Sequence, residues 1–482
     1  VTDFDIERSR ATEPLFYHAP CPDNMTPKQY QLAGVEYALE RPHMLFGDAP
    51  GLGKTAECIL LGNAIEAKRT LVVCPASLRL NWEREIWKWS TIENVSTYCI
   101  LKGKDGVSEV ANFVIISYSL LSNPSILNAI MAVTWDHMIL DEAHAIKDPK
   151  GNKRTQVICA PDLLPSVVGR ITLASGTILP NQPIECYNAI RLLNWDAIDR
   201  MSLEGFRNTY YEMGSGYVRG PVWDNDAQAN VWKMHWSEEV RNVPTNLTDL
   251  QNRLRKNIMV RRLKEQVLHE LPPVQWHPFP LQMTTRIRKA LKHEGWRKAE
   301  KLYEMNAGAF DDGIPVDGAV STARRELGEA KAPLIVEYIK ELLDEGITKL
   351  VVAAWHLSVL AYLRDELREY GLVYMDGSTS ATKKQTVVDQ FQEDEETQII
   401  LGQMLPLGEG WTLTAAQDVV LAEPDWVPGK NSQMLDRISR MGQEGSYTIG
   451  HIPVVPDTLD ERILNTAITK DQNIYQALDA QH

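Results

Sequence analysis

The 482-residue sequence has no run of about 18 consecutive apolar residues, so it predicts no membrane-spanning helix. Its first residues contain neither a basic nor an apolar segment, and they predict no signal peptide. The six cysteines form no CxxC pair, which argues against a structural zinc site, and their dispersion fits a reducing compartment. We therefore expect an intracellular protein, cytoplasmic in a bacterium or a phage-infected cell and nuclear in a eukaryote.

The sequence also lacks an excess of basic residues, since 64 acidic residues face 50 lysines and arginines, giving a net charge of −14. Taken alone, this balance disfavours a nucleic-acid partner, because Lys and Arg bind the phosphate backbone. Local basic clusters nevertheless occur, and each is either a solvated helix face or part of a DNA track. They are Lys147, Lys150, Lys153 and Arg154; Arg253, Arg255, Lys256, Arg261, Arg262 and Lys264; and Arg286, Arg288, Lys289, Lys292, Arg297 and Lys298.

Short β-rich apolar runs alternate with helical patterns in both halves of the chain, and this alternation predicts two α/β lobes with parallel sheets. The runs lie at 71–75, 113–118, 137–142 and 171–176, and again at 349–355, 398–403, 418–424 and 447–455. Between and beside them we expect helical insertions. The predicted segments are an N-terminal extension (1–24), a first lobe (25–190), its helical protrusion (191–257), an inter-lobe linker (258–280), a second helical protrusion (281–330) and a second lobe (331–482).

The segment DAPGLGKT (48–55) follows an apolar stretch and precedes a helical one, which is the setting of a phosphate-binding loop. Gly51 and Gly53 permit a close backbone approach to phosphate, Lys54 can reach the β- and γ-phosphates, and the Thr55 hydroxyl can bind Mg²⁺. Asp48 stands where the usual pattern has its first glycine. The alternative is an ordinary glycine-rich turn.

The segment MILDEAH (138–144) is an apolar strand that ends in two adjacent carboxylates. Asp141 suits the metal, and Glu142 suits the base that orients the attacking water. His144 either couples hydrolysis to the second lobe or is a core histidine. The alternative for the whole segment is a solvated strand end.

Arg437 and Arg440 lie three residues apart near the C-terminus, which predicts one face of a helix. A guanidinium directed at the γ-phosphate stabilises charge during phosphoryl transfer, so both are candidate catalytic residues. The alternative is an exposed basic helix.

These motifs, in this order, resemble helicase superfamily 2 and specifically its Swi/Snf-related DNA-translocase family, from about Thr26 to Gln443. The resemblance is carried by MTPKQYQLAGVEYAL (25–39), GDAPGLGKT (47–55), LVVCPASLRLNWEREIWKW (71–89), DEAHAIKDPKGNKRT (141–155), LASGTILPN (173–181), IMVRRLKEQVLHELPP (258–273), YMDGSTS (374–380) and LAEPDWVPGKNSQMLDRISRMGQ (421–443). The last stretch looks closest to the annealing-helicase (HARP-like) branch. Ile178 replaces the usual proline of the third motif, and 403–416 lacks the family's run of small residues.

The resemblance implies two RecA-like lobes, with Gln31 reading adenine and Asp48, Gly410 and Gln433 among the nucleotide-binding residues. It implies ATP and Mg²⁺ as cofactors, and double-stranded or branched DNA as the partner, with a targeting protein as a further one. The implied function is DNA-stimulated ATP hydrolysis with translocation on duplex DNA, in DNA repair, replication-fork remodelling or strand annealing. Two alternatives stay open: a strand-separating RNA helicase of the DEAH type, and the motor subunit of a restriction or phage DNA-processing complex.

Overall fold

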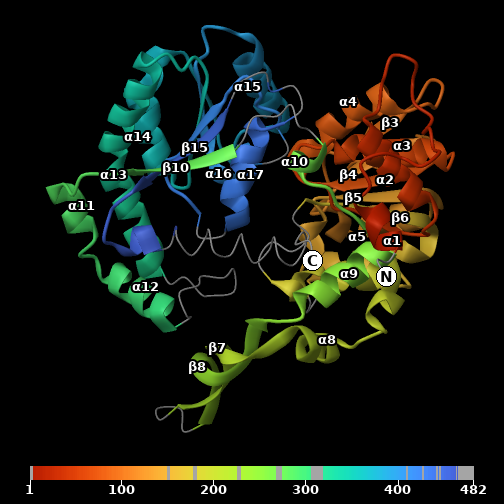
Figure 1. Cartoon of the computed structure of the whole chain (residues 1–482), viewed down its shortest axis with the longest axis horizontal. Coiled ribbons are helices and arrows are strands. Elements are labelled where there is room, and N and C mark those ends of the chain that lie inside the picture. Colours follow the sequence, from red (N-terminus) through yellow and green to blue (C-terminus); the bar gives the residue numbers. More distant parts are fainter. Residues whose placement is uncertain are drawn as a thin grey trace. The chain divides into compact units, whose positions relative to one another are not determined.

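The computed structural model describes residues 4–148, 152–176, 182–224, 229–267, 274–305, 318–408, 411–425, 428–440, 443, 447–462 and 464. The chain forms two compact units (Figure 1). The first unit contains the described residues up to Phe206 together with those of Leu247–Leu271, and the second contains those of Arg207–Asn246 and of Pro272–Gln476. Across the described residues, no helix is both long and apolar enough to cross a membrane.

The first unit is built on a parallel sheet whose central strands are completely buried. Strands buried on both faces read as continuous apolar runs, which is how the sequence revealed them. In spatial order the strands are β3 (Thr97–Cys99), β4 (Phe113–Ser117), β2 (Thr70–Cys74), β5 (Trp135–Asp141), β6 (Val168–Ala174), β1 (Met44–Phe46) and β9 (Met259–Val260).

One apolar core formed by helices and strands of the first unit includes Val72, Ile115 and Ile139 from the strands. Three of these helices, α2, α3 and α4, contribute most of the helical side chains in that core. The α-helices are α1 (Phe4–Ser9), α2 (Gln29–Leu39), α3 (Lys54–Ala64), α4 (Arg79–Trp89), α5 (Pro124–Met131), α6 (Lys153–Cys159), α7 (Tyr187–Asn194), α8 (Leu203–Tyr210, which ends in the second unit), α9 (Leu247–Asn257) and α10 (Lys264–Val267).

The second unit has its own parallel sheet, in the spatial order β10 (Val274–Pro280), β15 (Thr448–Val454), β14 (Asp418–Leu421), β11 (Leu350–Ala354), β13 (Ile399–Gln403) and β12 (Leu372–Met375). Two apolar cores lie on it, one with Val351 and Ile400 and the other with Val352 and Leu401, as expected for alternating strand faces. Its helices are α11 (Thr285–Ala290), α12 (Glu294–Met305), α13 (Gly318–Asp344), α14 (Leu357–Leu367), α15 (Ala381–Glu393), α16 (Met404–Gly408) and α17 (Pro428–Ile438).

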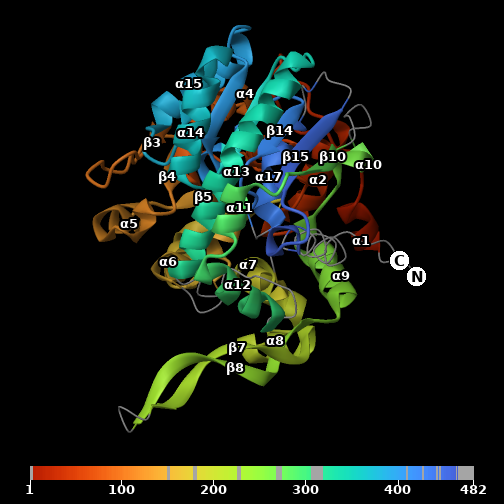
Figure 2. The same cartoon turned by 90° about the vertical axis from the view of Figure 1, so that its left-hand side faces the viewer.

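The prediction of a helical protrusion over 191–257 was wrong in its middle. Between α8 and α9 the chain forms an antiparallel ribbon of β7 (Tyr211–Asp224) and β8 (Ala229–Pro244), with Tyr211 opposite Pro244 and Asp224 opposite Ala229 (Figure 2). The segment contains glycines, two prolines and several β-branched and aromatic residues; the glycines and prolines disfavour a helix, and the others favour strands.

The two ends of the predicted linker 258–280 are strands of the two sheets. Its start, β9, pairs in parallel with β1 at the edge of the first sheet, and its end, β10, pairs with β15 at the edge of the second. Pro272 and Pro273 lie outside the described residues. In the region of the second predicted protrusion, the described chain is helical in α11, α12 and the first turns of α13.

Candidate nucleotide-binding site

The phosphate loop and the acidic strand end come together because of the strand order in the first sheet. β6 lies between β1 and β5, with Phe46 beside Ala174 and Ala174 beside Asp141. The carboxyl ends of these three parallel strands therefore meet at one edge, where open α/β sheets bind ligands. The loop is packed against this edge so closely that a β-carbon on Gly176 would lie 2.8 Å from Pro50 Cδ.

The loop has the backbone that an anion site requires. Gly51 and Gly53 adopt φ angles of +88° and +76°, in the left-handed region that favours glycine. Helix α3 begins at the next residue, Lys54, so its N-terminal N–H groups and dipole face the loop. Thr55, the predicted metal ligand, occupies the first turn and is half-buried.

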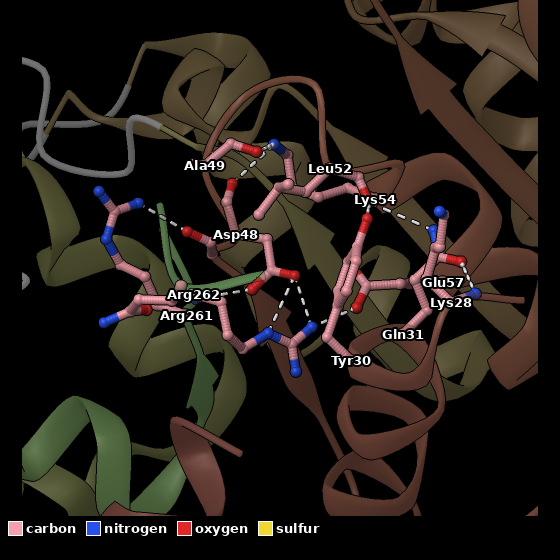
Figure 3. Close-up of polar contacts among 12 residues, drawn as sticks. Lys28, Tyr30, Gln31, Asp48, Ala49, Leu52, Lys54, Glu57, Arg261 and Arg262 are labelled. Atoms are coloured by element: carbon pink, nitrogen blue, oxygen red, sulfur yellow. Dashed lines mark hydrogen bonds and ion pairs between the residues drawn. The ribbon is translucent and has the colours of Figure 1, made fainter. Parts of the chain in front are cut away.

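Lys54 is held over the loop by hydrogen bonds from its Nζ to the backbone oxygens of Asp48 (2.8 Å) and Ala49 (3.3 Å) (Figure 3). Burial lowers the pKa of this ammonium below its ordinary value, while the carboxylates of Glu142, Asp48 and Asp141 act in the opposite direction. A desolvated cation that bonds to neutral carbonyls is suited to exchange them for phosphate oxygens.

Asp141 is fixed at the end of β5 by two donors. Trp82 Nε1 donates to its Oδ2 at 2.7 Å, and the backbone N–H of Glu142 donates to its Oδ1 at 2.9 Å. Burial first, and then the neighbouring charge of Glu142, raises the pKa of Asp141 to about 6, so a cation at this site would favour its ionised form. Tyr118 also anchors the strand end, since its hydroxyl donates to the Asp141 carbonyl at 2.7 Å.

Glu142 has a left-handed backbone, with φ +50° and ψ 53°, which is uncommon for a residue with a side chain. Such strain costs on the order of 1–3 kcal/mol and occurs preferentially at functional sites. His144 Nδ1 lies 3.3 Å from Glu142 Oε2, which places this half-buried histidine beside the acidic strand end. Asp141 is thus buried and hydrogen-bonded to Trp82, whereas Glu142 is half-buried and has a left-handed backbone, so the two carboxylates lie in different environments.

A buried charge cluster lies directly beneath the loop. The Arg262 guanidinium donates to both Asp48 and Glu57, and the exposed fraction of all three side chains is 0% (Figure 3). Arg262 Nε donates to Asp48 Oδ2 at 3.1 Å, and its backbone N–H donates to Asp48 Oδ1 at 2.9 Å. Burial and the carboxylate of Asp48 raise the pKa of Glu57 well above its usual range.

This cluster corrects two predictions from the sequence. The Asp48 side chain is turned away from the loop and fully engaged by Arg262, so any contact with a nucleotide can come only from its backbone. Arg262 and its neighbour Arg261 are buried and are not part of a DNA track. Arg261 Nη1 donates to the carbonyls of Gly47 (2.6 Å) and Gly176 (2.9 Å), just after the ends of β1 and β6.

Helix α2 holds the other side of the loop through the Leu52 carbonyl. Tyr30 Oη donates to this oxygen at 3.0 Å and Gln31 Nε2 at 3.2 Å, while Gln31 Oε1 accepts from the Lys28 N–H at 2.9 Å (Figure 3). The predicted adenine reader thus also supports the phosphate loop, and its contact with adenine stays a prediction. Trp82, Glu57 and Arg262 were missed by sequence reasoning, although the unexpected acidic residue at position 48 signalled a buried cation nearby.

The predicted arginine pair lies in the second unit. Arg437 is buried in the last turn of α17 and its Nη2 donates to the Gly408 carbonyl, whereas Arg440 lies beyond the helix end and donates from Nη1 to Thr412 Oγ1 at 3.4 Å. The two arginines therefore do not share one helical face, because α17 ends at Ile438. Gln433 is half-buried on the same helix, and Gly410 lies outside the described residues, as do 177–181.

The three basic clusters differ sharply in exposure. In the first, Lys147 Nζ lies 3.2 Å from Glu185 Oε1, and Lys150 lies outside the described residues. In the second, Arg255 is buried and donates to the Arg261 carbonyl at 2.9 Å, in addition to the buried pair described above. The third is exposed throughout, at Arg286, Arg288, Lys289, Lys292, Arg297 and Lys298.

The donor set of the first unit fits a triphosphate and a divalent cation. Left-handed glycines, a helix N-terminus and a desolvated lysine can bind phosphate oxygens. Within the described parts of the chain, no cluster of three or more His, Cys, Asp or Glu residues could hold a metal on its own.

Comparison with protein families matches residues 30–323 to the SNF2-related domain and residues 334–442 to the helicase conserved C-terminal domain. Among curated proteins, the chain is 30% identical over 441 residues to the SWI/SNF-related matrix-associated actin-dependent regulator of chromatin subfamily A-like protein 1 of Xenopus tropicalis, over 90% of this chain and 43% of that protein. It is 29% identical over 454 residues to the human DNA annealing helicase and endonuclease ZRANB3, over 91% of this chain and 39% of that protein.

The chain thus spans less than half the length of these two relatives. Among solved structures, the Sulfolobus solfataricus SWI2/SNF2 ATPase core in complex with dsDNA aligns with a TM-score of 0.42 and 18% sequence identity, covering 97% of this chain and 100% of that one.

Proposed function

The chain belongs to the family defined by the SNF2-related domain followed by the helicase conserved C-terminal domain, and from this premise we propose that it is a DNA-stimulated ATPase that translocates on duplex DNA. Both family models match in the expected order and together cover most of the chain. The single observation that carries the ATPase part is the meeting of Lys54 and Asp141 at one edge of the first sheet.

In this proposal each residue of the first unit has one task. Lys54 leaves the two backbone carbonyls that it contacts and binds the β- and γ-phosphates of ATP. Thr55 and Asp141 would hold Mg²⁺, which neutralises charge on the phosphate oxygens when bound. Glu142 orients the attacking water and accepts its proton, helped by a backbone that separates its side chain from that of Asp141.

Arg437 and Arg440 of the second unit are proposed to stabilise the charge that develops during γ-phosphate cleavage. Their guanidinium groups bond to the Gly408 carbonyl and to Thr412 Oγ1. We propose that the arginines exchange these partners for phosphate oxygens when the nucleotide is engaged, which would couple hydrolysis to movement.

The DNA part of the proposal draws on the relatives. One is named a DNA annealing helicase, and the match extends over 91% of this chain. We therefore propose duplex or branched DNA as the track, with DNA repair, fork remodelling or strand annealing as the setting. Because the relatives are much longer, we also propose that targeting relies on a protein partner or on a further domain.

The test is the ATPase rate with duplex DNA, forked DNA, single-stranded DNA and RNA. We expect strong stimulation by duplex or forked DNA, and loss of turnover in Lys54→Ala with every nucleic acid. Stimulation by single-stranded RNA alone, with fuel-dependent unwinding of an RNA duplex, would instead support the strand-separating RNA helicase that the DEAH segment also suggests. Unchanged turnover in Lys54→Ala would refute the site assignment itself.

A further inference from the structure

Helices α11 and α12 are placed by the topology of the second sheet at its carboxyl edge. β10 runs parallel to β15 in a register that pairs Pro280 with Val454, and α11 begins at Thr285, directly after β10 ends. All strand pairs of this sheet are parallel, so the loops after β11, β12 and β13 emerge at the same edge. This is the edge at which open α/β sheets bind their ligands.

The solvent-facing side of these two helices is strongly basic. Residues 285–301 carry seven lysines and arginines against two glutamates, a net charge of +5 in a chain whose total is −14. All seven cationic side chains are exposed. We call this set the α11–α12 basic face: Arg286, Arg288, Lys289, Lys292, Arg297, Lys298 and Lys301.

The two glutamates leave most of this charge uncompensated. Glu294 contacts Lys298 at 3.5 Å, and Glu300 contacts Arg462 outside the basic face. Within the described residues, the other six cations of the face form no ion pair. Six exposed like charges on adjacent helices create a local positive potential that attracts a polyanion.

Helices α11 and α12 are anchored by a buried apolar core on the side opposite the basic residues. Ile287, Ala290, Trp296 and Ala299 are buried in an apolar core that α11 and α12 share with the first turns of α13, which lies beside them in both views (Figures 1 and 2). The core also includes Leu459, after the last strand of the sheet. The basic side chains therefore project from a rigid base, which a positioning contact with a regular polymer requires.

We propose that the α11–α12 basic face binds the phosphate backbone of duplex DNA. The inference rests on the proposed function, and it names the surface of the second unit that contacts the DNA during translocation. The α11–α12 basic face is preferred over the clusters at 147–154 and 253–264. The arginines of those two clusters are largely buried or paired inside the first unit, whereas the cations of the α11–α12 basic face are exposed. Contacts from flexible Lys and Arg side chains to phosphates carry no sequence information, so the binding is expected to be independent of sequence.

The size of the effect follows from counterion release. Each phosphate contact contributes about 0.9 to the slope of log K against log salt concentration. If three cations of the face each contact one phosphate, their removal lowers the slope by about 2.7. At 0.15 M salt the same loss corresponds to an affinity decrease on the order of 100-fold.

The test variant is Arg286→Gln/Arg288→Gln/Lys289→Gln, which removes three charges from exposed positions and keeps good helix-forming residues. We expect the Kd for duplex DNA to rise by about two orders of magnitude at 0.15 M salt, with the smaller salt slope given above. The basal ATPase rate without DNA and the thermal unfolding midpoint should equal those of the unaltered protein, because these side chains lie outside the ATP site and the core.

The matched control removes three cations from the opposite, amino edge of the same sheet. Lys340 lies near the end of α13, Arg364 lies in the last turn of α14, and Arg368 follows α14; each helix leads into the next strand. Lys340→Gln/Arg364→Gln/Arg368→Gln changes the net charge equally, and we expect DNA affinity within about threefold of the unaltered protein, since distant charges are largely screened at this salt concentration.

Three outcomes overturn the inference in different ways. If the unaltered protein binds duplex DNA and the test variant binds it equally well, the surface is wrong while the proposed function stands. If both triple variants weaken binding equally, only overall charge matters and the face has no specific role. If the unaltered protein neither binds duplex DNA nor is stimulated by it, the proposed function fails together with the inference.

Discussion

Replacing Arg262 with methionine tests whether the buried cluster under the phosphate loop supports the first unit. The side chain donates three hydrogen bonds to carboxylates, two to Asp48 and one to Glu57, and none of the three side chains is exposed. Methionine has a similar length but no charge, so the two carboxylates would face each other without a cation. Removing one partner of a buried ion pair costs about 3–5 kcal/mol.

Urea unfolding followed by tryptophan fluorescence measures this loss, and hydrogen exchange in α3 and β9 assigns it to the first unit. With an m-value of about 2 kcal/mol/M, the midpoint should fall by about 2 M. The control is Arg200→Met, which breaks the exposed ion pair between Arg200 and Asp196. We expect little change there, because exposed pairs contribute little to stability.

A double-mutant cycle with Asp48→Asn separates the charge cluster from simple loss of packing. Asparagine keeps an acceptor for the Arg262 backbone N–H but removes the charge that Arg262 balances. We expect Asp48→Asn/Arg262→Met to be less destabilised than the sum of the single changes, by about 1–3 kcal/mol. Additive effects, or an Arg262→Met midpoint equal to that of the unaltered protein, would refute the reasoning.

Three further predictions follow from the same unit. Trp82→Phe removes the 2.7 Å hydrogen bond to Asp141, a charge-assisted bond of about 1.5–3 kcal/mol, and should lower ATP turnover on the order of 10-fold; turnover within twofold would contradict the role. Burial lowers the pKa of His137 to about 3, whereas the unfolded chain takes up a proton near pH 6.5, so the free energy of unfolding should fall by about 2 kcal/mol from pH 8 to pH 5. Urea titrations should show this loss in the unaltered protein and not in His137→Asn; equal pH dependence would refute it. Gly34→Ala places a β-carbon 2.8 Å from Glu57 Oε1, so thermal unfolding should show destabilisation of about 1–3 kcal/mol, and a gain in stability, as helix propensity alone predicts, would argue against tight packing.

The sequence alone was sufficient for the parts of the protein whose chemistry is local. The loop from Gly51 to Thr55 is defined by glycines with left-handed backbones, a lysine and a helix start, all within a few residues. The strand that ends at Asp141 is readable because a strand buried on both faces is continuously apolar. The alternation of such strands with helices also predicted two parallel-sheet units correctly.

Only the tertiary structure decided which charges are available to a partner. Arg262 and Arg288 look alike in the sequence, yet one is fully buried against Asp48, 214 positions away along the chain, and the other is exposed. The same holds for Trp82, whose partner Asp141 lies 59 positions further on. Residue type sets what a side chain can bind, but burial and long-range partners set whether it is free to do so, and these depend on how distant segments pack together.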